Sequence, residues 1–174
     1  MESHEIDQIF NDTFKNLTFF YRDTDLQEYL ISKYHIGQII RNPAFTDMTY
    51  LESGLVKNLR YIIASTKGVD LSAFQDDSTI RGHCLLQPNA LFKVLDIINV
   101  GKQVLILLLN IPNGTADFFN EITSTTEEEI IAAVKRNYIE MLKFPVNKEL
   151  QSAEWIFRNE FPLGMDTYGE IFKI

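Results

Sequence analysis

The chain has 174 residues, a formal charge of −8, 45% apolar residues and 23% charged residues. This apolar fraction supports a packed core, so the composition excludes a wholly disordered chain and favours one domain. The acidic balance repels nucleic-acid phosphates, so we expect no nucleic-acid partner. The single cysteine, Cys84, excludes an internal disulfide framework.

The sequence also bears on localisation. Its longest apolar run, at 104–109, is too short to cross a bilayer. The acidic N-terminus MESHEIDQIF has neither the basic region nor the apolar region of a signal peptide. We therefore expect a cytoplasmic protein with no membrane association, and signal-independent secretion remains open.

The hydrophobic periodicity and turn residues predict short elements in the first half of the chain. They are, in chain order, a helix at 6–17, an aromatic strand at 17–21, a helix at 25–34, a strand at 38–40, a helix at 51–59, a strand at 60–65, a polar loop at 75–82 and a strand at 83–86.

The second half predicts a hairpin and then helices. Runs at 92–98 and 102–111 form the hairpin, and the continuous VLILLL run at 104–109 indicates a central strand. A capping box at 124–127 begins a long helix, and EWIFRNEF at 154–161 predicts a short one. The pattern indicates an α+β fold with a mixed or antiparallel sheet. We expect a single domain over 1–174, with a β-rich core at 1–112 and a helical extension at 113–174 packed on it.

Motifs of common enzyme classes are missing from the sequence. The three histidines have no metal-ligand spacing, so no metal site is predicted. There is no G-x-S-x-G elbow, P-loop or G-x-G-x-x-G. Zinc hydrolases, serine hydrolases and P-loop enzymes are therefore unsupported.

Three ordered motifs are more informative. Tyr21-Arg22 ends an aromatic strand, and Gly37–Ile40 leads to Phe45–Thr49. Leu85–Pro88 is then followed by Phe92–Val94. In order and spacing, these segments resemble the core of the mono-ADP-ribosyltransferase fold found in bacterial exotoxins. The resemblance covers roughly residues 17–111.

The resemblance implies a reaction in which ADP-ribose is transferred from NAD to a macromolecule. Arg22 would hold the phosphates of NAD, because a guanidinium fork binds phosphate oxygens in pairs. Thr46, Asp47 and Thr49 would line the nicotinamide pocket. His83 falls at the position of the catalytic glutamate.

The chain departs from the family pattern at this last position and at others, among them Asp47-Met48-Thr49 in place of the family's Ser-Thr-Ser. A histidine cannot supply the negative charge that stabilises the departing ribosyl cation. Arg81 stands at the first glutamate of the family's E-x-E motif, and Asp23 replaces the glycine that follows the arginine. An active site that has degenerated is therefore one expectation. Whether another carboxylate replaces the glutamate stays open.

Each candidate residue also has a purely structural interpretation. Arg22 could form a surface ion pair, and Thr46 and Thr49 could simply favour a strand. Asp47 could cap a helix beginning near residue 50. His83 could face solvent on its strand or form a hydrogen bond beside Cys84.

Two alternative functions follow from these structural interpretations. The chain could be a catalytically inactive copy of the fold, or an unrelated α+β binding module. In either case the charge of −8 favours a basic protein partner, as an acidic immunity or adaptor protein would have.

Overall fold

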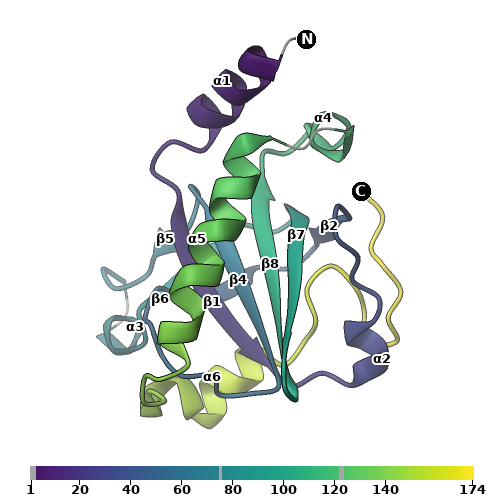
Figure 1. The fold of residues 1–174 in the computed structure, drawn as a ribbon. Helices are drawn as coiled ribbons and strands as arrows, with labels where there is room; N and C mark the ends of the chain where they lie inside the picture. The colour runs from purple at the N-terminus through teal and green to yellow at the C-terminus, as the bar shows by residue number, and fades with distance from the viewer. Residues whose placement is uncertain (1–2, 75, 122–123) are drawn as a thin grey trace.

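The computed structural model describes residues 3–74, 76–121 and 124–174. Within them the central feature is one mixed sheet of eight strands (Figure 1). The strands are β1 (Thr18–Thr24), β2 (Ile39–Asn42), β3 (Thr46–Thr49), β4 (Leu59–Ser65), β5 (Val69–Asp70), β6 (His83–Leu86), β7 (Ala90–Val100) and β8 (Gln103–Ile111). They lie in the order β2-β7-β8-β4-β1-β3-β6-β5.

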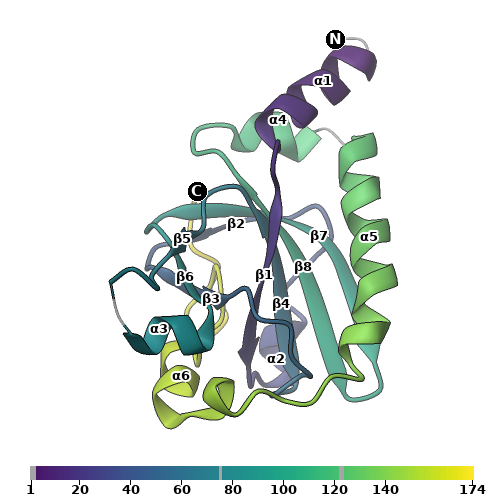
Figure 2. The ribbon, with the colours of Figure 1, turned by 90° about the vertical axis from the view of Figure 1, so that its left-hand side faces the viewer.

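Helices and the C-terminal chain cover the two faces of this sheet (Figures 1 and 2). The helices are α1 (Ser3–Thr13), α2 (Glu28–Ile31), α3 (Asp76–Arg81), α4 (Ala116–Glu121), α5 (Thr125–Met141), the 3-10 helix η1 (Lys148–Gln151) and α6 (Ala153–Arg158). Side chains of α1, α4 and α5 pack on one face in one apolar cluster. Side chains of α2 and of residues 163–165 pack in a second cluster on the other face. The sheet is therefore the middle layer.

The sheet confirms the predicted α+β class and the central position of the VLILLL run. β8 lies between β7, to which it is antiparallel, and β4, to which it is parallel. The predicted hairpin is β7–β8, closed at Val100 and Gln103, with a bulge between Val94 and Asp96. A strand with neighbours on both sides and helices over its face buries both of its faces, which explains its continuous apolar sequence.

The capping box predicted at the start of α5 is also confirmed. The hydroxyl of Ser124 accepts a hydrogen bond from the backbone N–H of Glu127, and the Glu127 carboxylate accepts one from the N–H of Ser124. Glu127 is buried, and its second oxygen lies 2.9 Å from Nζ of Lys93 on β7. This pair joins α5 to the sheet.

Three local predictions were wrong. Residues 51–58 form no helix, because the carbonyls of Ser53 and Gly54 accept hydrogen bonds from the buried Arg60 side chain. The helix predicted at 25–34 is only α2, since the chain turns after it to bury Tyr34. The polar loop predicted at 75–82 contains α3, and residue 75 lies outside the described residues. None of the described helices has the length and hydropathy needed to span a membrane.

Candidate functional site

The three motifs come together on adjacent strands. β1 carries Arg22, β3 carries Thr46, Asp47 and Thr49, and β6 begins with His83. The register places Tyr21 opposite Thr49 and Thr49 opposite His83. Tyr21 and His83 are 62 positions apart in the sequence, and the sheet brings both of them next to Thr49, as the resemblance implied.

Arg22 is fully enclosed rather than open to a ligand. Its Nη1 donates hydrogen bonds to Oδ1 of Asn159 at 2.7 Å and to the carbonyl of Asp47 at 3.1 Å. Its Nη2 donates to the carbonyl of Phe161 at 3.0 Å. Burial lowers the pKa of Arg22, because the charged form is removed from water. The interpretation of Arg22 as a surface ion-pair residue is wrong, since only 4% of this residue is exposed.

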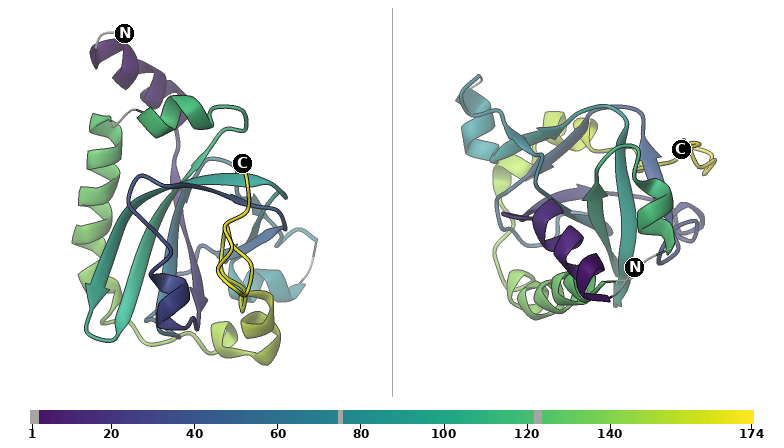
Figure 3. Two further views of the ribbon diagram at one scale, coloured as in Figure 1. Left: turned by 90° about the vertical axis from the view of Figure 1, so that its right-hand side faces the viewer. Right: turned by 90° about the horizontal axis from the view of Figure 1, so that it is seen from above.

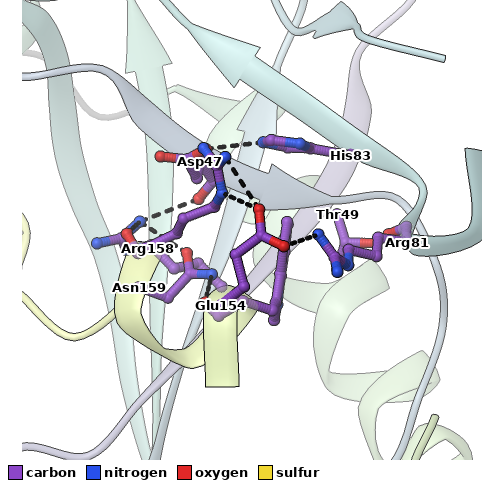
Figure 4. Close-up of polar contacts among 9 residues, drawn as sticks. Asp47, Thr49, Arg81, His83, Glu154, Arg158 and Asn159 are labelled. Carbon is purple, nitrogen blue, oxygen red and sulfur yellow. Dashed lines mark hydrogen bonds and ion pairs between the residues drawn. The ribbon is translucent and has the colours of Figure 1, made fainter. Parts of the chain in front are cut away.

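His83, which the sequence motifs align with the family's glutamate, pairs with a carboxylate. Its Nε2 lies 2.7 Å from Oδ1 of Asp47, and Nη1 of Arg158 lies 3.6 Å from the same oxygen (Figure 4). The ring of Trp155 meets the His83 ring edge to face at 5.0 Å. His83 is buried, so its interpretation as a solvent-facing residue is wrong. The carboxylate of Asp47 brings negative charge to this position.

The two threonines have different surroundings. Thr49 Oγ1 donates to the carbonyl of Arg81 and accepts from the N–H of Leu51, so it fixes the ends of β3 and β6. Alternation along β3 places Asp47 and Thr49 on one side and Thr46 on the other. Thr46 accepts a hydrogen bond from the Asn42 amide and is fully buried there. The structure therefore brings Asp47, Thr49 and His83 together and leaves Thr46 apart. Asp47 caps no helix, because it lies within β3.

Two further ion pairs, both formed by Glu154 of α6, lie beside this site (Figure 4). Oε2 of Glu154 lies 3.2 Å from Nη1 of Arg81, and Oε1 of Glu154 lies 3.2 Å from Nη2 of Arg158. Hydrogen bonds from Arg158 and Arg81 lower the pKa of the Glu154 carboxyl. The pair of Glu154 with Arg81 connects α6 to α3, and Arg158 connects α6 to Asp47 on β3.

The departure at Asp23 has a structural cause. Asp23 on β1 lies opposite Arg60 on β4, and its two oxygens accept from Arg60 Nε at 2.6 Å and Nη2 at 2.8 Å. Arg60 is only 1% exposed, so its charge needs a buried partner. The aspartate that replaces the family glycine is therefore part of the core of this chain.

The residues that close the site were not predicted from sequence. Trp155, Arg158, Asn159 and Phe161 contact the strand motifs from more than 70 positions away along the chain. The EWIFRNEF pattern predicted a helix at 154–161, and the structure has α6 at Ala153–Arg158, which ends three residues earlier. Amphipathic spacing indicates that a helix has a buried face, but it does not indicate what covers that face.

The described residues show no group of three or more His, Cys, Asp or Glu side chains placed to hold a metal ion. Cys84 is buried, and its burial raises the pKa of the thiol to about 11. A thiol with so high a pKa is protonated near neutral pH and a poor nucleophile, which agrees with the interpretation of Cys84 as a small buried side chain.

No protein-family model matches the sequence, and no curated protein matches it. The solved structures to which the chain is similar include the type III effector XopAI of Xanthomonas axonopodis pv. citri, with 16% identity over 57% of this chain and 46% of that chain at a TM-score of 0.49. They also include the ADP-ribosyltransferase HopU1 of Pseudomonas syringae pv. tomato, with 20% identity over 55% and 45% at a TM-score of 0.49.

Exoenzyme S of Pseudomonas aeruginosa, solved with carba-NAD and a human 14-3-3 protein, is 12% identical over 65% of this chain and 64% of its own at a TM-score of 0.48. The chain thus spans about half the length of the first two proteins. The similarity is one of fold, and it agrees with the class that the sequence motifs resemble.

Proposed function

We propose that this chain is an ADP-ribosyltransferase-like protein whose dinucleotide site is closed by its own C-terminal segment (residues 148–174), and that it acts by binding a protein partner. The observation that carries the proposal is the environment of Arg22. The guanidinium expected to bind the phosphates of NAD donates its hydrogen bonds to Asp47, Asn159 and Phe161 instead. A phosphate group would have to displace two residues of the C-terminal segment.

The closure is supported by contacts beyond Arg22. Tyr34 Oη donates to the carbonyl of Leu163 at 2.7 Å, and the N–H of Leu163 donates to Tyr61 Oη at 3.2 Å. Burial raises the pKa of Tyr61 to about 12, so both tyrosine hydroxyls stay neutral and bonded near neutral pH. Leu163 and Met165 are part of the apolar cluster on this face. Opening the site would expose these side chains to water.

The chemistry at His83 supports a binding role as well. In the family, a carboxylate stabilises the positive charge that develops on the ribose as nicotinamide leaves. His83 offers no such charge, and the neighbouring Asp47 is paired with His83 and lies close to Arg158. A carboxylate shared in this way is a weaker stabiliser of a developing cation.

A second candidate function is transferase activity after the C-terminal segment moves away. The position of Asp47 favours it, because this carboxylate lies beside the position of the missing glutamate. Arg22 would then hold the NAD phosphates, with Asp47 and Thr49 near the nicotinamide ribose. The bond from nicotinamide to the ribose carbon would break, with its electron pair leaving on nicotinamide. A nucleophile of the acceptor would bond to that carbon and lose a proton.

An NAD titration separates the two functions. The wild-type chain is expected to show no saturable heat of binding at about millimolar NAD, where a tighter site would be filled, and no release of nicotinamide. Asn159→Ala removes one acceptor from Arg22, and Asn113→Ala is the matched control at an exposed loop residue. Saturable binding of NAD by the wild-type chain, with or without release of nicotinamide, would overturn the proposed function. Binding gained only by Asn159→Ala would favour the second candidate.

A further inference from the structure

A groove of about 450 Å³ lies between the end of β1, α2 and the C-terminal segment. Of these, α2 and the C-terminal segment run side by side in Figure 3. Leu26 and Leu30 are buried at its floor, and Tyr29 and Phe161 are its aromatic residues, 48% and 52% exposed. The groove is therefore a solvent-open hollow with an apolar base and aromatic walls.

Carboxylates give this hollow its charge. Asp25 and Glu160 line it, and both are exposed. Among the described residues that line the groove, none is basic. A positive group placed there would face two carboxylates and two aromatic rings, and both kinds of group attract cations.

The walls of the groove are held in place by hydrogen bonds. Tyr29 Oη donates to the carbonyl of Thr167 at 3.3 Å, which joins α2 to the C-terminal segment. Thr24 Oγ1 donates to the carbonyl of Glu160 at 3.3 Å, and Arg22 Nη2 donates to that of Phe161. A groove already formed in the free protein loses little conformational entropy when a ligand binds.

We propose that this groove binds a lysine or arginine side chain presented by a basic protein partner. The charge of −8 attracts such a partner over a longer range, and the groove supplies the local contact that recognises it. The aliphatic stem of a long basic side chain packs on Leu26 and Leu30. Its charged end lies between the aromatic rings and reaches the carboxylates of Asp25 and Glu160.

This inference rests on the proposed binding function and identifies its partner chemistry. The closed site and the groove share Phe161. Its carbonyl accepts a hydrogen bond from Arg22, which also donates to Asn159, and the same residue lines the groove. Closing the dinucleotide site therefore builds one wall of the groove. A ligand that drew Arg22 away from Phe161 would weaken the groove, so NAD and the basic partner would oppose each other's binding.

The test is the binding of a fluorescent oligolysine peptide to the full chain, followed by anisotropy at about 0.15 M salt to screen distant charges. The double variant Asp25→Asn/Glu160→Gln keeps the size of both side chains and removes both charges. We expect it to weaken binding about tenfold or more. Phe161→Leu keeps an apolar wall without an aromatic ring and is expected to weaken binding by a smaller factor.

The matched control is Glu128→Gln/Glu129→Gln, which removes the same charge from exposed positions on α5. Unchanged binding by this control supports a specific groove. Equal weakening by both double variants, or no binding of oligolysine to the wild-type chain, overturns the inference. The NAD titration is independent: NAD binding by the wild-type chain overturns the proposed function, whatever the peptide does.

Discussion

Replacing Arg22 with alanine is expected to lower the free energy of unfolding by about 3 kcal/mol or more, because the change removes one side of a buried charged network. Oδ1 of Asn159 and the carbonyl of Phe161 would each lose the donor that they contact in the folded chain. The C-terminal segment would lose its principal polar contact with β1. Urea unfolding at neutral pH measures the difference.

Two further variants, one intermediate in effect and one surface control, test this prediction. Arg22→Lys retains the positive charge but loses the planar fork, so its expected loss of stability lies between those of wild type and alanine. Arg136→Ala, at an exposed position on α5, should change the stability by less than about 0.5 kcal/mol. An Arg22→Ala chain as stable as wild type would contradict the assignment of Arg22 to a buried network.

Replacing Asp23 with alanine is the second change with a large expected effect, again about 3 kcal/mol or more in unfolding free energy. It would leave the guanidinium of Arg60 buried without its counter-charge, while the carbonyls of Ser53 and Gly54 stayed bonded to it. The backbone at Val56 would also lose its contact with β1, because Asp23 accepts a hydrogen bond from the N–H of Val56. Thermal unfolding followed by circular dichroism measures this effect.

Glu140→Ala is the matched control for Asp23. Its carboxylate pairs with Lys143 on the surface, where ion pairs contribute little. We expect a change of less than about 0.5 kcal/mol. If the two alanine variants lost equal stability, the pair of Asp23 and Arg60 would not be a buried element of the core.

Local sequence patterns predicted the parts of the fold that local interactions determine. The capping box at Ser124 and the continuous apolar run of β8 were correct, because a helix start and a doubly covered strand leave signatures in neighbouring residues. The helix predicted at 51–59 was wrong. There the backbone carbonyls serve a buried arginine on β4, and no pattern within the segment carries that information.

The candidate site was predicted only in part, because some of its contacts join residues that are far apart along the chain. Spacing along the chain indicated Arg22, Thr46, Asp47, Thr49 and His83, and the adjacent strands β3 and β6 bring Asp47, Thr49 and His83 together and leave Thr46 apart. The contact of Arg22 with Asn159 joins residues 137 positions apart, and periodicity reports nothing at such a separation. The pairing of Asp23 with Arg60 depends likewise on the register of β1 and β4.

The most direct test of the account is the solvent accessibility of Trp155, the single tryptophan of the chain. It belongs to the C-terminal segment itself, is 3% exposed, and packs against His83 of β6. If the segment is closed, Trp155 gives the emission of a buried tryptophan and slow quenching by acrylamide, and neither changes when about millimolar NAD is added. Fast quenching in the free protein, or quenching that NAD accelerates, would show that the segment opens over Arg22 and would contradict the closed site.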